Sequence, residues 1–357
     1  MDTDPNYVLA PIHRSLTRTH RSPALGVRHD SSHPGATFSL RTCLIMEPRT
    51  STRLQRASNA AATSEISVDR SEQCGHWVPS PSDGLSAIAS LRQHWPEYLM
   101  ELGELGCYLL VACLATTLLP HPASIVRQFV SSSLVRGSLM GLVMGATTIA
   151  LVMSTWGKRS GGHFNPAITF TFYRMGKVEF WDGLFYVFAQ LLGAIGGVAL
   201  ARYVLQGALS NHAVHYAVTV PGVYGWAVAF VAELIISLFL MVTILFSTNH
   251  ETLAPYTAYF GGALIVLLFP VGAQLSGMST NPARSFGPAV QADSWHALWI
   301  YFVAPSMGML AAAETFLRMR RGVAPYCAKL HHVNEERCIF DHTPEFPRRR
   351  LYANTSR

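Results

Sequence analysis

The sequence is poor in charged residues, which make up only 13% of its 357 residues, whereas half of the residues are hydrophobic and the mean hydropathy is positive. A chain with so little charge does not have the composition of an ordinary soluble domain. The opening stretch also lacks the apolar core typical of a secretory signal peptide. The composition therefore predicts an integral membrane protein that is not secreted.

Cysteines are few and scattered. Two fall in the first apolar segment and four in polar flanking regions, in the order Cys43, Cys74, Cys107, Cys113, Cys327 and Cys338. This spacing does not resemble the disulfide framework of a small secreted domain, so we expect reduced thiols.

Composition divides the chain into three parts. Residues 1–95 are rich in Arg, Ser, Thr, Pro and His without a periodic apolar pattern, which predicts a disordered basic N-terminal tail. Residues 96–320 are apolar, and residues 321–357 form a polar C-terminal tail. The net charge of +6 lies largely in the two tails. It indicates positive charge flanking a membrane rather than a nucleic-acid surface, so no nucleic-acid partner is expected.

Six segments are long enough to cross roughly 30 Å of hydrocarbon at about 1.5 Å per helical residue. They run from Leu102 to Leu119, Leu134 to Met153, Phe180 to Val204, Gly225 to Ser247, Tyr256 to Ala273 and Ala297 to Leu317. An even number of spans places both termini on one side. Basic residues in the tails and between the second and third spans predict cytoplasmic termini in a plasma or inner membrane.

Asn-Pro-Ala occurs twice, at Asn165-Pro166-Ala167 and Asn281-Pro282-Ala283, and the two copies lie 116 residues apart. One copy alone would indicate an ordinary helix start, because Asn caps free backbone N–H groups and Pro suits the first helical turn. Two copies within a pattern of six spans indicate a membrane pore.

The two halves of the apolar region repeat one another. Glu101 begins the first span and Glu233 lies early in the fourth, and each is followed by two further spans and one motif. Each repeat, about 96–205 and 222–318, has three spans, so the second copy must be inverted in the membrane. The predicted fold is an all-α membrane protein with six transmembrane helices and two re-entrant half-helices.

The pore chemistry follows from this geometry. The short apolar stretches after the motifs, 168–173 and 285–290, suit half-helices that reach the middle of the bilayer. Their N-termini would meet with their positive dipole ends, while each Asn caps its own helix and points its amide N–H groups into the lumen. The preceding loops would present carbonyl oxygens. The residues expected to line the pore are Gly161, Gly162, His163, Phe164, Gly277, Ser279 and Thr280.

These features resemble the aquaporin family, the major intrinsic proteins, over roughly residues 96–320. The resemblance depends on both motifs, on His163 and Arg284 beside them, and on the paired Glu101 and Glu233. It implies an hourglass pore in each subunit, a homotetramer in the membrane and no cofactor.

Within that family the sequence is similar to the water-selective branch. Ser285 stands where glycerol facilitators usually carry Asp, and Ala289, Tyr301 and Phe302 indicate the same branch. Counting from the motifs without gaps places the outer selectivity filter at Gly145, Phe269, Met278 and Arg284. Water channels favour an aromatic residue and a His at the first two positions, so Gly145 and Phe269 predict a wider, more apolar filter.

Several residues have structural alternatives. Glu101 and Glu233 are expected to support the re-entrant loops rather than contact solute, because buried ionisable groups need partners. His163 suits packing and pore lining equally, whereas Arg284 is expected to act in the pore. The glycine series at Gly137, Gly141, Gly145, Gly193 and Gly197 indicates close helix packing. Gly145 is expected to serve both packing and the filter.

One cluster in the C-terminal tail has the residue types of a zinc site, namely Cys327, His331, Cys338 and His342. Its spacing matches no common zinc module, so a solvated tail is the favoured interpretation.

The sequence thus predicts a passive channel for water, and for small neutral solutes if the filter is wide, which excludes ions and protons. A glycerol or other small-solute facilitator is the main alternative. A coupled transporter would need an acidic ion ligand beside the motifs, and an ion channel would need rings of carboxylates or a carbonyl filter. The spans contain no metal-ligand pair or serine nucleophile motif, so we do not expect an enzyme.

Overall fold

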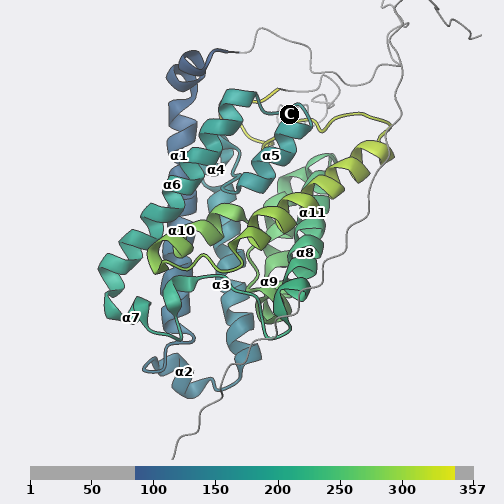
Figure 1. The fold of residues 1–357 in the computed structure, drawn as a ribbon. Coiled ribbons are helices and arrows are strands. Elements are labelled where there is room, and N and C mark those ends of the chain that lie inside the picture. Colours follow the sequence, from purple (N-terminus) through teal and green to yellow (C-terminus); the bar gives the residue numbers. More distant parts are fainter. Residues whose placement is uncertain (1–84, 342–357) are drawn as a thin grey trace, which may run out of the picture. The chain divides into compact units, whose positions relative to one another are not determined.

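The structure, a computed structural model, describes residues 85–341, and within this range every regular element is a helix. Figure 1 shows their arrangement. In chain order the elements are α1 (Ala87–Leu118), α2 (Ile125–Phe129), α3 (Ser133–Met153), α4 (Thr155–Ser160), α5 (Pro166–Arg174), α6 (Phe180–Leu205), α7 (Gly207–Ser210), η2 (His215–Ala217), α8 (Gly225–Thr248), η3 (Ala254–Tyr256), α9 (Thr257–Ser276), α10 (Pro282–Ala292) and α11 (Leu298–Met319).

Six of these helices are long and apolar enough to cross a membrane, namely α1, α3, α6, α8, α9 together with η3, and α11. They coincide with the six predicted spans, and the predicted fold class is confirmed. Helix α1 begins at one face of the described bundle, where α11 ends (Figure 1). We refer to this face as the terminal face.

Helix α1 begins earlier than the predicted first span, at Ala87 rather than at Leu102. The Ser86 side chain caps it by accepting a hydrogen bond from the Ala89 N–H at 3.3 Å. Polar residues in the added turns, among them His94 and Glu97, are buried. Such residues lower the mean hydropathy of the segment although they are not exposed to solvent. The hydropathy pattern therefore did not predict this part of the helix.

The two repeats pack in the same way. Helix α1 packs against α6 in the first repeat, α8 packs against α11 in the second, and α3 packs against α9 across them. Gly193 and Gly197 of α6 lie directly on the backbone of α1, and Gly308 of α11 lies on α8 in the same manner. A side chain at these positions would collide with backbone oxygens, so the glycines permit the close crossings.

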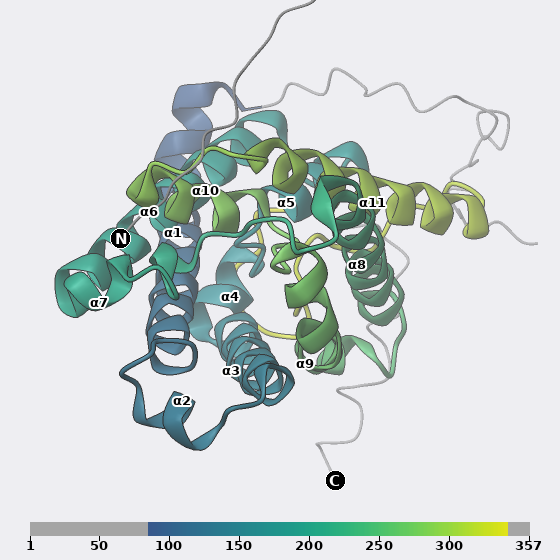
Figure 2. The same cartoon turned by 60° about the horizontal axis from the view of Figure 1, so that its bottom comes forward.

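The half-helices interlock the repeats. Helix α5 of the first repeat packs against α11 of the second, and α10 of the second packs against α6 of the first (Figure 2). Each half-helix begins with a buried Asn-Pro pair, at Asn165 and at Asn281. The two motifs are therefore held inside the bundle by contacts that neither repeat provides alone.

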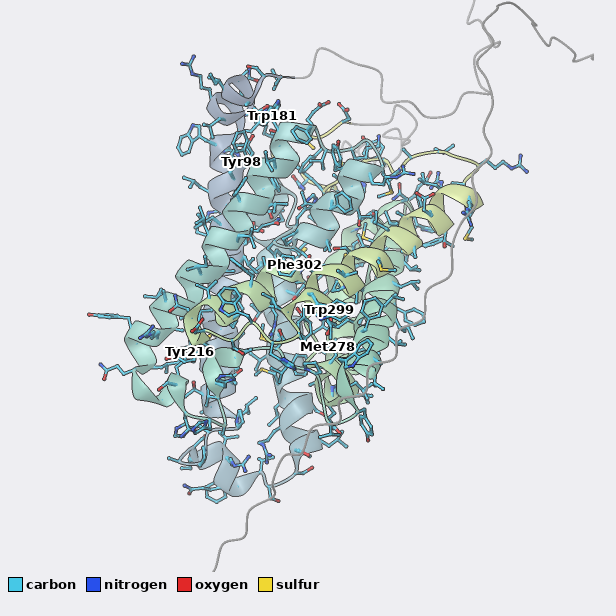
Figure 3. The ribbon with its side chains drawn as sticks, in the orientation of Figure 1. Tyr98, Trp181, Tyr216, Met278, Trp299 and Phe302 are labelled. Carbon is cyan, nitrogen blue, oxygen red and sulfur yellow. The ribbon has the colours of Figure 1, made fainter. Side chains whose placement is uncertain are left out.

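Large apolar side chains cover the outer surface of the bundle. Trp299 and Phe302 of α11 are exposed (Figure 3), and Trp299 contacts Trp226 of α8 with ring centroids 6.2 Å apart. In water such a surface would favour aggregation, whereas lipid chains solvate it.

The C-terminal region differs from the expected solvated tail as far as Asp341, where the described residues end. Cys327, Ala328, Lys329, Leu330 and Phe340 are buried. They are buried because the chain after α11 returns to the terminal face, where its backbone bonds to the loop before the first motif. The expectation of a solvated segment is therefore wrong for these residues.

The candidate zinc cluster does not assemble among the described residues. The Cys327 and Cys338 sulfurs lie 3.6 Å apart, but no group of three or more His, Cys, Asp or Glu side chains within residues 85–341 is placed to hold a metal ion. The fourth predicted ligand, His342, lies outside the described residues, as do Cys43 and Cys74.

Candidate functional site

Two asparagines begin the half-helices with nearly identical geometry. The Asn165 Oδ1 atom accepts a hydrogen bond from the Ala167 N–H at 2.9 Å, and the Asn281 Oδ1 atom accepts from the Ala283 and Arg284 N–H groups at 3.0 and 3.2 Å. Their backbone angles are φ −154°, ψ 115° and φ −151°, ψ 114°. Each oxygen thus satisfies free N–H groups at its helix start, as expected of a cap.

The amide nitrogens of these asparagines join the two repeats. The Asn165 Nδ2 atom donates to the Thr280 carbonyl at 2.9 Å, and the Asn281 Nδ2 atom donates to the Phe164 carbonyl at 2.7 Å. The sequence predicted that these amide groups would be free. Because each amide has two N–H bonds, one fixes the loop of the other repeat and one remains for the cavity that both residues line.

Two buried glutamates support the loops before the motifs. Glu101 accepts hydrogen bonds from the backbone N–H groups of His163 and Phe164 at 2.9 and 2.6 Å. Glu233 accepts from those of Ser279 and Thr280 at 2.7 and 2.6 Å. Phe164 and Thr280 have positive φ angles of 29° and 53°, which cost energy in residues other than glycine. The carboxylates stabilise this strained backbone.

A second pair of supports follows the same repeat. The Tyr186 hydroxyl donates to the Ser160 carbonyl at 2.6 Å, and the Tyr301 hydroxyl donates to the Ser276 carbonyl at 2.8 Å. Sequence reasoning missed Tyr186 and treated Tyr301 only as a mark of a subfamily. Both tyrosines lie near the start of the third span of their repeat, and this equivalence was the signal that could have identified them.

Arg284 lies at the start of α10. Its backbone N–H belongs to the Asn281 cap, and its guanidinium Nη1 donates to the Ala217 carbonyl at 3.3 Å. Ala217 is the last residue of η2, where Tyr216 (Figure 3) and Ala217 have positive φ angles of 54° and 58°. The arginine therefore holds an irregular loop beside the half-helix and adds a positive charge to the helix start.

A cavity of about 50 Å³ lies between the motifs and the terminal face. Of the predicted pore residues, His163, Phe164, Ser279 and Thr280 line it, together with Asn165 and Asn281. Gly161, Gly162 and Gly277 do not. The residues missed by the sequence analysis are Tyr108, Thr148, Val152, Ile168, Leu240, Ile244, Thr257, Ala258, Gly261, Ile265 and Leu330. Helical spacing within the spans, such as Leu240 with Ile244, was the available signal for most of them.

His163 is bound at both ring nitrogens. Its Nδ1 atom lies 3.1 Å from the Thr169 hydroxyl, and its Nε2 atom lies 2.9 Å from the Ala328 carbonyl. Since a carbonyl only accepts, the Nε2 atom carries the proton in this arrangement. The ring thus both packs inside the protein and lines the cavity, the two alternatives that the sequence left open.

Gly145 packs against a neighbouring helix, and its assignment to the outer filter stays a prediction. A Cβ atom there would lie 2.6 Å from the Gly262 carbonyl oxygen of α9, and Gly145 does not line the cavity on the terminal side. Thr148 and Val152 are the α3 residues that line the cavity, and the buried Met144 lies on the same helix face, one turn earlier.

The other three filter candidates are buried but do not line this cavity. Phe269 is 8% exposed, Met278 is 6% exposed, and Arg284 is 9% exposed. Met278 occupies a bend with φ 48°, and its backbone N–H bonds to the Ser276 hydroxyl at 3.2 Å. The cavity on the terminal side is therefore not the place where these three residues could contact a solute.

Comparisons with known proteins agree with this architecture. The model of the family described as "Major intrinsic protein" matches residues 98–316. The chain is 35% identical to nodulin-26 of Glycine max over 178 residues, which is 50% of this chain but only 64% of that relative. It is 27% identical to aquaporin-8 of Mus musculus, covering 69% of this chain and 92% of that protein. It is 32% identical to the glycerol uptake facilitator protein-like 6 of Lactiplantibacillus plantarum, covering 49% and 81%.

A solved structure shows the same fold. The aquaglyceroporin from Plasmodium falciparum superposes with a TM-score of 0.53 at 18% identity, covering 63% of this chain and 96% of that one. Six membrane-spanning helices, two opposed half-helices and the family match lead to one conclusion: the chain belongs to the major intrinsic protein family of membrane channels.

Proposed function

We propose that the protein is a passive channel for water that excludes ions and protons. The observation that carries the proposal is the pair of asparagines at the meeting half-helices, each fixed by its cap and by a bond to the other repeat. Both present an N–H donor to the same cavity. Paired donors orient the oxygen of a passing water molecule and interrupt a continuous chain of water-to-water hydrogen bonds.

Charge at the centre supports the exclusion of cations. Two helix N-termini place positive dipole ends at the motifs, and Arg284 adds a full positive charge at the start of α10. Glu101 and Glu233 do not line the cavity, and their carboxylates accept hydrogen bonds from backbone N–H groups. The arrangement suits a neutral permeant and opposes a cation.

The cavity has the dimensions of a short column of water. A volume of about 50 Å³ at about 10–15 Å³ per water centre gives room for roughly four molecules. Apolar atoms form most of its surface, so water meets few strong hydrogen-bonding groups and passes with a low barrier.

A small neutral solute is the second candidate permeant. It is favoured by the relative named as a glycerol uptake facilitator and by Phe269, which lacks a polar group at the expected filter position. Against it, Ser285 is held by the Ser279 and Thr219 hydroxyls, both at 2.5 Å, in the place where the glycerol branch of the family carries Asp. We also propose that both termini are cytoplasmic, because the tails are basic, and that the protein forms a homotetramer, as the family resemblance implies.

Purified protein in liposomes would test these proposals. Stopped-flow light scattering should show water permeability above that of empty vesicles with a low activation energy, and no proton or ion current. Parallel gradients of glycerol and ammonia would identify a second permeant. Water permeability equal to that of empty vesicles, both in the wild type and in the variant with an opened mouth described below, would refute the water channel.

A further inference from the structure

The C-terminal segment, residues 326–341, lies against the loop that carries the first motif. The Leu330 N–H donates to the Gly161 carbonyl at 3.0 Å, and the Ala328 carbonyl accepts from the His163 Nε2 atom at 2.9 Å. Gly161 and His163 belong to the loop whose polar groups were expected to meet water. The segment therefore occupies hydrogen-bonding groups at the terminal end of the pore.

Two apolar side chains of the segment complete this contact. Leu330 is 5% exposed and lines the same cavity as the two asparagines. Phe340 stacks on the His163 ring at 5.4 Å between centroids, with Phe172 at 5.3 Å on the other side. The imidazole is thus enclosed between the channel and the C-terminal segment, and Leu330 contributes to the cavity wall.

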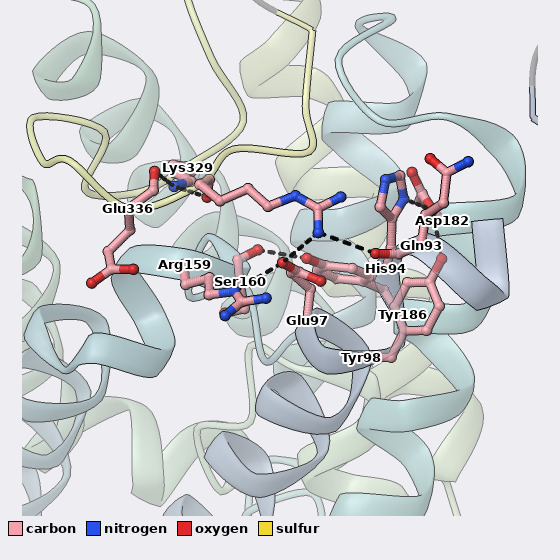
Figure 4. A network of polar contacts seen from close by, with 11 residues as sticks. Gln93, His94, Glu97, Tyr98, Arg159, Ser160, Asp182, Tyr186, Lys329 and Glu336 are labelled. Carbon is pink, nitrogen blue, oxygen red and sulfur yellow. Dashed lines mark hydrogen bonds and ion pairs between the residues drawn. The ribbon is translucent and has the colours of Figure 1, made fainter. Parts of the chain in front are cut away.

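The segment has an internal structure of its own. The buried Lys329 ammonium donates to the carbonyls of Glu336 and Arg337 at 3.1 and 2.7 Å, and the Cys327 and Cys338 sulfurs lie 3.6 Å apart. These contacts fold the segment back on itself. Lys329 and Glu336 are visible together in Figure 4.

Polar contacts at both ends of the segment also attach it to the bundle. The Tyr326 N–H bonds to the Asn249 side chain at the end of α8 at 2.8 Å. The exposed Arg337 guanidinium bonds to the Gln93 carbonyl at 3.2 Å and lies 3.9 Å from the Glu97 carboxylate, which also binds Arg159 (Figure 4). Glu97 is buried and already paired with Arg159 at 2.9 Å, whereas Arg337 is exposed to water and more distant, so this pair adds little to docking beside the buried apolar contacts.

We propose that residues 326–341 form a lid that closes the terminal mouth of the pore, with Leu330 as its plug. The inference rests on the proposed water channel. Water replaces the Leu330–Gly161 and His163–Ala328 hydrogen bonds when the lid leaves, so their net contribution is modest. Burial of Leu330 and Phe340 then sets the balance between closed and open forms, and small changes in these residues should shift it.

Water flux in liposomes tests the plug. Leu330→Ala should raise water permeability per protein severalfold over wild type, because the lid loses apolar burial and no longer fills the cavity. Val333→Ala, an aliphatic truncation in the same segment that does not line the cavity, is the matched control and should behave as wild type. Equal permeability in Leu330→Ala and Val333→Ala would overturn the plug assignment.

Thiol labelling measures lid opening without relying on transport. Cys327 is 1% exposed in the closed lid, so a small maleimide, followed by peptide mass spectrometry, should modify it slowly in the full-length wild type. Phe340→Ala and Leu330→Ala should each accelerate this modification severalfold, since each removes buried apolar contact that holds the segment closed. Cys327 labelling at the wild-type rate in both variants would overturn the lid.

The two measurements separate failure of the lid from failure of the water channel. Faster Cys327 labelling in Leu330→Ala without water flux in any variant would reject the water channel and retain a mobile segment at the mouth. High water flux in the wild type, unchanged by Leu330→Ala, would retain the channel and reject the lid.

Discussion

Replacing Glu101 by Gln tests whether the first motif is held in place by its buried carboxylate. Glu101 accepts three hydrogen bonds, from the His163 and Phe164 N–H groups and from the Gln190 side chain at 2.7 Å. A glutamine has the same shape but only one oxygen. Whichever way its amide turns, an NH₂ group faces a backbone donor.

The cost follows from counting these bonds. One buried backbone N–H without a partner costs about 1–3 kcal/mol. The remaining hydrogen bonds lose their charged acceptor, which adds about 1 kcal/mol. We therefore expect Glu101→Gln to destabilise the protein by about 2–4 kcal/mol. It should also displace the Phe164 carbonyl that holds Asn281, and so reduce water flux.

Glu104 supplies the matched control. It lies one turn further along α1, is equally buried, and accepts one hydrogen bond, from the Ser160 hydroxyl at 3.0 Å. A hydroxyl rotates and can donate or accept, so Glu104→Gln should cost less than about 1 kcal/mol. Thermal unfolding in detergent and stopped-flow water flux would be measured on both variants. Equal losses in stability and flux would refute the supporting role of Glu101.

The remaining predictions address the pore centre, the filter and the C-terminal cysteines. Asn281→Asp should reduce water flux or admit cations, because it replaces a donor by an acceptor; unchanged water and proton permeability in the folded variant would contradict this. Gly145→Ala should lower stability by about 1–3 kcal/mol through overpacking, with per-molecule flux retained. Met144→Ala should instead alter the ratio of glycerol to water permeability, and an altered ratio in Gly145→Ala but not in Met144→Ala would favour Gly145 as the filter residue. Metal analysis of purified protein should find only trace zinc; near-stoichiometric zinc that is lost in Cys327→Ser would show that a metal site forms with residues beyond 341.

Hydropathy and local chemistry predicted most of the fold. The spans were legible because each is apolar over a length that matches the bilayer, and the half-helices because Asn followed by Pro is a local start signal. The role of Glu101 was expected from the cost of burying a carboxylate. These inferences needed only the residue, its neighbours in sequence and the solvent.

Features that depend on distant contacts were not predicted. The start of α1 was hidden because His94 and Glu97 look solvated until Asp182 and Arg159 are placed beside them. The C-terminal segment was assigned to solvent because Lys329 resembles an exposed charge, although two carbonyls bind its ammonium. Position in three dimensions, rather than residue type, decides these cases.

The difference between the two motif loops explains why one mouth of the pore accommodates a lid. His163 and Ser279 occupy equivalent positions, two residues before their asparagines, and both reach a hydroxyl four residues after them. The His163 ring lies 3.1 Å from the Thr169 hydroxyl, and the Ser279 hydroxyl lies 2.5 Å from that of Ser285. The Ser279 side chain has no further polar atom beyond this hydroxyl. The imidazole has a second nitrogen on its far edge, which bonds to Ala328 of the lid. A histidine in place of a serine thus gives the terminal mouth an outward-facing donor, and an open lid would return that donor to water.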